Sequence, residues 1–346
     1  MINKIIHVLI VDDSTVACQL LTHIIESDPQ LKVVGYAKNG EQALKWLQTN
    51  SCDVITMDIH MPSINGFEVT QKIMESKPLP TIIISSGYTS SDEELAFKAI
   101  EAGALAILEK PIGFDDVKYA AKSQEIIDTL KMVSGIKLVT RRPKQSFRES
   151  RLLLSKTVEK REIKAVGIGA SLGGPLAIAQ ILEELPASFP IPIFIVQHIA
   201  VGFSDEFIRW LQGRSKLQIY SARDGEIAKP GCVYIGADAS QMHIKHGDVI
   251  SLDYSTIPST QPSVNHLFKS LADTYGPHCV GVILTGMGRD GAKELLNMKK
   301  NGAYTIAQDE ASCLMFGMPK EAILLDAVRE ILPLNMIAAR LIELVE

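Results

Sequence analysis

The sequence predicts two α/β domains, each built on a mainly parallel β-sheet, with a basic connector between them. The chain has 346 residues, which is about the length of two ordinary domains. Short apolar runs alternate with helical patterns from residue 5 to about 124 and again from about 161 onward. Residues 125–160 interrupt this alternation with nine basic and four acidic side chains. We therefore predict domains at 1–124 and 161–346, joined by a linker at 125–160.

Composition and charge exclude several classes of protein. The net charge of −5 argues against nucleic-acid binding and against attraction to anionic membranes. No apolar stretch of the sequence reaches the roughly 18 residues that membrane insertion requires. Five scattered cysteines without a Cys-x-x-Cys spacing indicate a reducing, cytoplasmic setting without a disulfide framework or a zinc site. The basic linker is interpreted as a solvated connector, and a docking strip for an acidic partner is the alternative.

The first domain is expected to contain a five-stranded parallel sheet with helices on both faces. The predicted strands are 5–11, 31–37, 54–57, 81–85 and 106–108. The predicted helices are 15–27, 40–50, 67–75 and 93–101. The first strand leads directly into Asp12 rather than into a small-residue cleavage site, so we do not interpret it as a signal peptide.

Polar side chains follow these strands at their carboxyl ends. Asp12 and Asp13 follow the first strand, Asp58 follows the third, Ser85 ends the fourth and Lys110 follows the fifth. Ligands of open parallel sheets bind at this edge, so we expect the five side chains to converge. Converging carboxylates repel one another unless a cation lies among them, and Mg²⁺ prefers oxygen ligands. Such a carboxylate can accept a phosphoryl group, whereas each Asp alone is more typical of a helix N-cap.

These residues and their neighbours resemble the receiver domain of two-component response regulators. The matching stretches are Asp12-Asp13-Ser14, 57–66, 82–86, 102–104 and 109–111, which together extend over about 120 residues. The resemblance implies a flavodoxin-like fold in which a histidine kinase is the phosphodonor for Asp58. It also implies that Asp12, Asp13, Asp58 and the main-chain carbonyl of His60 hold Mg²⁺.

The resemblance also assigns the switch residues of the receiver. Ser85 and Lys110 are expected to bind the phosphoryl group and to move on phosphorylation. Ile107 stands three residues before the lysine, where receivers usually have an aromatic switch residue. We therefore expect phosphorylation at Asp58 but not the usual aromatic readout of it.

The second domain is predicted as a doubly wound, mostly parallel α/β sheet. Its predicted strands are 165–169, 193–197, 218–221, 233–235, 280–284 and 304–307. Its predicted helices are 175–185, 204–211, 264–275, 291–301 and 319–325. His243 and His246 precede a turn at 247–248, which we interpret as a solvated hairpin, with a metal-binding pair as the alternative.

Three polar residues follow strands of this second domain. Ser171 lies in a glycine-rich turn that opens a helix, which fits a nucleophile elbow and equally fits a phosphate-binding loop. His198 ends the next strong strand, and Asp290 lies in a glycine-rich loop past another. Alone, His198 would make a structural hydrogen bond and Asp290 would cap the following helix. Together they predict a nucleophile, a base and an orienting carboxylate at the strand carboxyl ends. The chain order differs from that of α/β-hydrolases.

The order and the surrounding stretches resemble the chemotaxis response regulator protein-glutamate methylesterase family. The matching stretches are 169–174, 196–198, 224–226, 229–236, 262–264, 284–292, 307–312 and 316–322. The resemblance implies hydrolysis of glutamyl methyl esters on the cytoplasmic domain of chemoreceptors, with release of methanol and without a cofactor in this domain. Some members also deamidate receptor glutamines. Ser171 is then the nucleophile, His198 the general base, Asp290 its orienting carboxylate and the Met287 N–H an oxyanion donor.

Six positions around the expected cleft depart from the family's usual residues. They are Leu172, Ile199, Ala200, Gln261, Asn265 and His266. These departures bear on the substrate preference rather than on the reaction. We expect the unphosphorylated receiver to cover the Ser171 cleft. The alternative function is a receiver with a catalytically silent docking domain in a non-chemotaxis signalling cluster. A transcriptional regulator fits less well, since the acidic second half offers no basic helix-turn-helix. A nucleotide-binding enzyme would use the glycine-rich loop 167–174, which misses the usual dinucleotide spacing.

Overall fold

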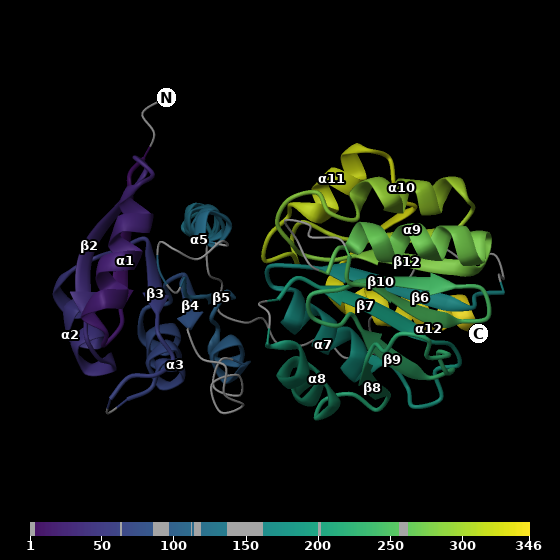
Figure 1. Cartoon of the computed structure of the whole chain (residues 1–346), viewed down its shortest axis with the longest axis horizontal. Helices are drawn as coiled ribbons and strands as arrows, with labels where there is room; N and C mark the ends of the chain where they lie inside the picture. The colour runs from purple at the N-terminus through teal and green to yellow at the C-terminus, as the bar shows by residue number, and fades with distance from the viewer. Residues whose placement is uncertain are drawn as a thin grey trace. The chain divides into compact units, whose positions relative to one another are not determined.

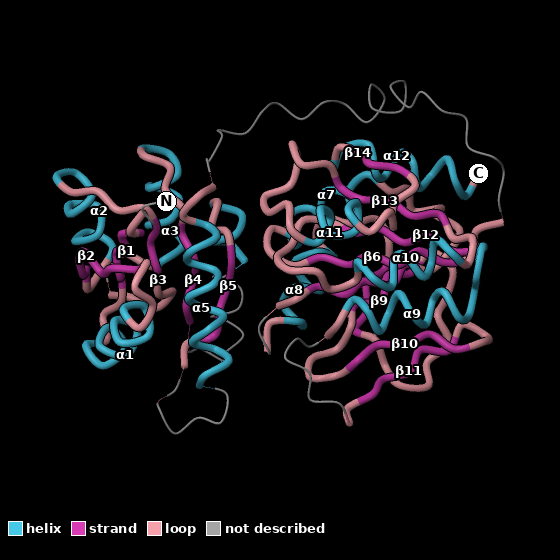
Figure 2. Tube along the Cα trace, turned by 90° about the horizontal axis from the view of Figure 1, so that it is seen from above, coloured by secondary structure: helices cyan, strands magenta, loops and turns pink. Residues whose placement is uncertain are grey.

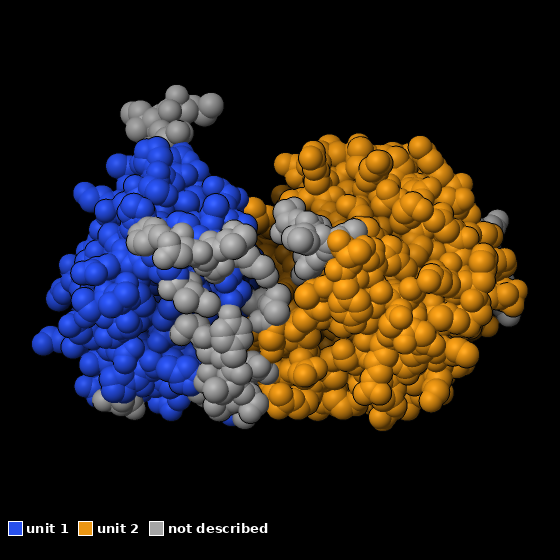
Figure 3. All heavy atoms as spheres, viewed as in Figure 1, with its two compact units in different colours: residues 1–142 blue, residues 143–346 orange. Residues whose placement is uncertain are grey.

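The computed structural model describes residues 4–62, 64–85, 97–111, 113, 119–136, 162–199, 202–255 and 262–346. The chain divides into two compact units, residues 1–142 and residues 143–346 (Figure 3). Most of the predicted linker, the residues Ala200 and Gln261 and part of the predicted helix 93–101 lie outside the described residues. None of the helices in the described ranges has the length and apolar character that a membrane crossing requires.

The first unit contains the predicted five-stranded parallel sheet (Figure 1). Its strands are β1 (Ile6–Val11), β2 (Leu31–Ala37), β3 (Val54–Met57), β4 (Thr81–Ser85) and β5 (Ala106–Glu109). They are ordered β2-β1-β3-β4-β5, and every pairing is parallel. Strands β3 and β4 are buried along their whole length. Both faces of this sheet are therefore covered, as its continuous apolar strands require.

Capping residues fix where the helices of the first unit begin. The helices are α1 (Thr15–Glu26), α2 (Gly40–Thr49), α3 (Gly66–Ser76) and α5 (Tyr119–Val133). The side chains of Ser14, Asn39 and Asn65 each accept a hydrogen bond from the main-chain N–H three residues ahead. Helix α5 crosses residue 124 and contacts α1. The boundaries at 124 and 161 remain predictions, although residues 125–133 continue a helix of the first unit.

The second unit contains a seven-stranded sheet in which every pairing is parallel. Its strands are β6 (Ala165–Ala170), β7 (Ile193–Gln197), β8 (Gln218–Ser221), β9 (Cys232–Ile235), β12 (Cys279–Ile283), β13 (Tyr304–Gln308) and β14 (Glu330–Leu332). The order is β14-β13-β12-β6-β7-β9-β8. The strand that leads to Ser171 thus lies between the strands that lead to His198 and to the Asp290 loop.

Helices cover both faces of this sheet, so the predicted doubly wound architecture is confirmed (Figure 1). They are α7 (Gly174–Glu184), α8 (Ser204–Gln212), α9 (Val264–Tyr275), α10 (Ala292–Lys300), α11 (Met318–Leu324) and α12 (Leu334–Val345). Helices α9, α10 and α11 pack on one side, and α7, α8 and α12 pack on the other. A 3₁₀ turn, η1 (Gly276–His278), follows α9.

An antiparallel hairpin of β10 (Gln241–Lys245) and β11 (Val249–Asp253) lies along α9 (Figure 2). Its residues Met242 and Ile244 are buried in the same hydrophobic cluster as Leu267 and Phe268 of that helix. The hairpin that we predicted around residues 243–248 is therefore present. The sequence analysis did not predict β14 or α12. These two elements are joined by Arg340, whose buried guanidinium lies 2.7 Å from Glu330 of β14.

Candidate functional site

Ser171 lies at the turn between β6 and α7. Its main-chain N–H donates a hydrogen bond of 3.1 Å to the carbonyl of Thr285, which continues the pairing of β6 with β12 past the end of both strands. Gly173 has a φ of 78°, a conformation that disfavours side chains, and it serves as the N-cap of α7. This glycine allows the chain to reverse sharply and leaves the serine half-exposed at the sheet edge.

His198 and Asp290 form the predicted pair. Nε2 of His198 lies 2.8 Å from Oδ2 of Asp290, and the two side chains are only 15% and 13% exposed. Asp290 Oδ1 accepts a 2.8 Å hydrogen bond from the hydroxyl of Ser263, and Oδ2 accepts one of 2.7 Å from the N–H of Val264. Burial alone would raise the pKa of Asp290, but the hydrogen bonds from His198, Ser263 and Val264 outweigh it and lower the pKa. Asp290 is therefore a carboxylate at neutral pH.

Asp290 does cap a helix, but not the helix that follows it. Its Oδ1 also accepts a 3.1 Å hydrogen bond from the N–H of Asn265, so the carboxylate caps the N-terminus of α9. The N-cap of α10 is instead Gly291. The side chain of Asn265 returns a contact, since its Oδ1 accepts a 3.1 Å hydrogen bond from the N–H of Gly291. Asn265, one of the departing positions, thus holds the Asp290 loop by a hydrogen bond.

Ser171 and His198 are connected through Gln197, which ends β7. The Nε2 of Gln197 donates to the carbonyl of Ser171 at 2.9 Å and to the carbonyl of His198 at 2.7 Å. No hydrogen bond joins the Ser171 hydroxyl to the His198 ring in the described part of the chain. With Nε2 bound to Asp290, Nδ1 is the ring nitrogen that remains for the serine. The sequence analysis missed Gln197 and Ser263, although a glutamine at the end of a wholly apolar strand is itself a signal.

The Met287 loop lies beside Ser171. A Cβ placed on Gly286 would come within 2.8 Å of the Ser171 Cβ, so only glycine permits this approach. Gly286 donates to and accepts from loop 315–318, which fixes its peptide. Within the described ranges, the N–H groups of Leu172, Gly173 and Met287 have no hydrogen-bond partner. These N–H groups are the donors that a developing oxyanion could use.

Val264 lies between the strand of the serine and the loop of the aspartate. A Cβ on Gly169 or on Gly291 would clash with the same methyl of Val264, Cγ1, which the Gly291 Cβ would approach to 2.5 Å. Val264 is fully buried. The two glycines therefore let the first turn of α9 contact both loops at once.

Acidic side chains converge at the edge of the first sheet, as predicted. The carboxylate oxygens of Asp12, Asp13 and Asp58 lie within 4.8 Å of one another. Nζ of Lys110 lies 2.6 Å from Asp12 and 3.2 Å from Asp58. Burial raises the pKa of Asp58 to about 6, with Lys110 opposing the shift and Asp12 adding to it. For Lys110, burial would lower the pKa, but the carboxylates of Asp58 and Asp12 raise it above its usual value.

This cluster fits a divalent cation by the chemistry of its donors. Three carboxylates against one ammonium leave an excess of negative charge in a largely buried site, and oxygen ligands suit Mg²⁺. The main-chain N–H of Lys110 donates a 2.9 Å hydrogen bond to the carbonyl of buried Ser85, so the two predicted switch residues are neighbours. His60 is exposed two residues beyond Asp58, and Ile107 is buried in β5.

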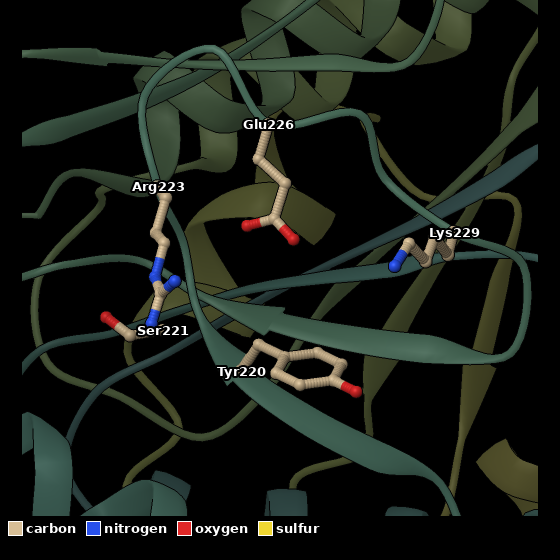
Figure 4. Close-up of a pocket in the computed structure, with 5 residues that line it drawn as sticks. All are labelled: Tyr220, Ser221, Arg223, Glu226 and Lys229. Atoms are coloured by element: carbon tan, nitrogen blue, oxygen red, sulfur yellow. The ribbon is translucent and has the colours of Figure 1, made fainter.

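Two other features lie apart from these residues. A pocket of about 190 Å³ is lined by Tyr220, Ser221, Arg223, Glu226 and Lys229. Figure 4 shows the carboxylate of Glu226 and the ammonium of Lys229 pointing into it beside the Tyr220 ring. On the hairpin, the ring of His243 packs edge-on against that of His266, with centroids 5.0 Å apart. The ring partner of His243 is therefore His266 of α9, which is one of the departing positions, and not His246.

The two folds and their sheet-edge residues define a response regulator whose output domain is an enzyme. Residues 8–122 match the response regulator receiver domain model, and residues 166–341 match the CheB methylesterase model. The chain belongs to the CheB methylesterase family. It is therefore a hydrolase with a receiver domain, and the alternative of a silent docking domain is not favoured.

Two relatives are similar to this protein over nearly the whole chain, and one solved structure is similar to about half of it. The protein-glutamate methylesterase/protein-glutamine glutaminase of Nitrosospira multiformis is 42% identical, with 98% of this chain and 97% of the relative covered. The corresponding protein 1 of Syntrophus aciditrophicus is 41% identical, with 98% of each covered. The crystal structure of the Thermotoga maritima CheB methylesterase catalytic domain is 38% identical, with a TM-score of 0.51, and covers 53% of this chain and 100% of its own.

Proposed function

We propose that this protein hydrolyses glutamyl methyl esters on the cytoplasmic domain of chemoreceptors and thereby releases methanol. The observation that carries the proposal is the 2.8 Å contact of His198 with an ionised Asp290, at the same sheet edge as Ser171. Membership of the methylesterase family supports the ester as substrate. The cytoplasm is the compartment where such a substrate and an enzyme with five free cysteines would meet.

The proposed reaction has two halves. His198 accepts the proton of Ser171 at Nδ1 as the serine oxygen attacks the ester carbonyl. The resulting oxyanion receives a hydrogen bond from the Met287 N–H, and Asp290 stabilises the imidazolium. Collapse breaks the bond to the methoxy group, which takes the proton from His198 and leaves as methanol. Water then attacks the acyl-serine by the same route, which restores Ser171 and leaves a free glutamate.

The test is methanol release from a methylated receptor fragment. Ser171→Ala is expected to lower the rate to background, because no hydroxyl remains to form the acyl-enzyme. Ser188→Ala is the matched control, since Ser188 is an exposed serine of the same domain. Methanol release by Ser171→Ala at the parent rate would reject the proposal.

We further propose that phosphorylation of Asp58 by a histidine kinase raises the esterase rate. Asp12, Asp13, Asp58 and the His60 carbonyl are the proposed Mg²⁺ ligands, and the bound ion would neutralise charge on the phosphoryl oxygens. Lys110 is held between two carboxylates and is placed to turn to a new phosphoryl group. Methanol release should rise when a small phosphodonor is added, and Asp58→Asn should remove this response. An Asp58→Asn protein that still responds would contradict the assignment.

Glutamine deamidation is a second activity of the same site. Two relatives carry protein-glutamine glutaminase in their names. Attack of the serine on a glutamine amide differs from its attack on the ester only in that ammonia leaves instead of methanol. Ammonia release from a receptor fragment with glutamine at the modified position should depend on Ser171. Absence of ammonia release by an enzyme that releases methanol would restrict the site to esters.

A further inference from the structure

Thr285 occupies the point where the nucleophile turn meets the Met287 loop. It is almost fully buried, two residues after the end of β12, and its hydrogen bonds reach three segments: the 171–172 turn, Gln308 and Met315. Its carbonyl accepts from the Ser171 N–H at 3.1 Å, and its own N–H donates to Oε1 of buried Gln308 at 2.8 Å. These two main-chain contacts fix the residue, whatever its side chain is.

The side chain of Thr285 adds a second connection. Oγ1 lies 2.9 Å from the carbonyl of Leu172 and 3.2 Å from that of Met315, and it accepts a 2.9 Å hydrogen bond from the Met315 N–H. A hydroxyl has one proton to donate, and we assign it to the shorter contact, with Leu172. The hydroxyl thus joins the turn of the nucleophile to the loop that supports Gly286.

The hydrogen bond from Thr285 to the Leu172 carbonyl determines the direction of the Gly173 N–H. The carbonyl and N–H of a trans peptide point in opposite directions, so holding the Leu172 carbonyl fixes the direction of the Gly173 N–H. That N–H has no partner among the described residues and lies two residues after Ser171. On the other side, Met315 accepts from the N–H of Gly286, the residue before Met287.

We propose that the Thr285 hydroxyl is a positioning group that holds the Ser171 turn and the Met287 loop in register for catalysis. It does not touch the substrate and takes no proton from it. The inference rests on the proposed esterase function. The Thr285 hydroxyl would act on the placement of the nucleophile and of the oxyanion donors. Loss of this hydroxyl should therefore lower kcat more than it changes KM.

The test compares Thr285→Val with Thr285→Ser in the full chain. Valine keeps the shape without the hydroxyl, and serine keeps the hydroxyl without the methyl. For methanol release, we expect Thr285→Val to lower kcat by about 10²-fold with little change in KM. Thr285→Ser should stay close to the parent. Equal rates for the two variants, or equal losses in both, would overturn the proposal.

Folding and function must be separated in this test. Circular dichroism and the melting temperature show whether each variant is folded at the assay temperature. If Thr285→Val is unfolded, Thr285→Ala against Thr285→Ser becomes the deciding pair, with the same expected loss and rescue. A parent protein that releases no methanol would reject the esterase function itself, whereas an active Thr285→Val would reject only the positioning role.

Discussion

The main-chain N–H of Val264 donates a 2.7 Å hydrogen bond to Oδ2 of Asp290, the same oxygen that lies 2.8 Å from Nε2 of His198. A helix N-terminus and an imidazole therefore share one carboxylate oxygen. The partial positive charge of the helix end favours the ionised form of that carboxylate. The acid of the proposed triad is thus also a structural cap, and its removal should affect both rate and stability.

Asp290→Asn is expected to lower kcat for methanol release by about 10³-fold or more, because an amide cannot stabilise the imidazolium as a carboxylate does. The melting temperature should also fall, since α9 loses a charged cap. Asp273→Asn is the matched control, because Asp273 is an exposed residue on α9 with a surface pair to Lys269. An Asp290→Asn protein with the parent's rate would show that Asp290 has no role in the reaction.

Asp58→Asn is expected to stabilise the receiver in the absence of divalent cations. The pKa of Asp58 is about 6 in the folded state against 3.8 for the free side chain. Between pH 3.8 and pH 6, the folded state therefore binds more protons at this residue than the unfolded state does. Stability therefore falls as the pH rises through this window, by an amount on the order of 3 kcal/mol. The gain from Asp58→Asn in thermal unfolding should be small at pH 4 and large at pH 7.5.

Asp28→Asn provides the control of opposite sign for that measurement. The hydrogen bond from Lys131 lowers the pKa of Asp28, so this carboxylate favours the folded state when it is ionised. Its replacement should give no gain at pH 7.5. A gain for Asp58→Asn that is the same at pH 4 and pH 7.5 would disprove the electrostatic explanation.

Removal of divalent cations should abolish the response of methanol release to a phosphodonor but leave its basal rate unchanged. With a chelator present, basal methanol release should be unchanged, because the proposed steps at Ser171 use only protein groups. The increase caused by a phosphodonor should disappear, because Asp12, Asp13 and Asp58 would no longer share a cation. The measurement is the ratio of the two rates with and without added Mg²⁺. A chelator that lowers the basal rate equally would contradict this division.

Arg340→Met is expected to lower the free energy of unfolding of the second unit by about 3 kcal/mol. The guanidinium is 1% exposed and lies 2.7 Å from Glu330 and 2.6 Å from Glu343. Without it, β14 and α12 keep two carboxylates that have lost their shared cation. Thermal unfolding followed by circular dichroism measures the effect. Lys269→Met, which removes an exposed pair on α9, should leave the melting temperature unchanged.

Local patterns predicted most of the fold. Strand β7, for example, is a short apolar run that ends in polar residues, and its parallel pairing follows from the α/β alternation. Strand β14 was missed because three residues at a sheet edge carry no periodicity. Its place depends on pairing with β13 and on the Arg340 bridge, which no local pattern records.

The site was predictable in its members but not in their contacts. Ser171, His198 and Asp290 follow from the rule that strand ends gather at one edge. The sequence did not predict that Asp290 caps α9. The residues that donate to it lie 25 to 27 positions earlier in the chain, and α10 is the nearer helix in the sequence. Gln197 and Thr285 were hidden for a related reason, since their roles are hydrogen bonds to the main chain of distant segments.

The position of Val264 between Gly169 and Gly291 has a consequence for the geometry of the site. Its side chain fills the space between the strand of the serine and the loop of the aspartate, and it is fully buried. A change in the bulk of this one aliphatic side chain is therefore expected to alter the spacing of Ser171 and Asp290 while the surface of the domain stays the same.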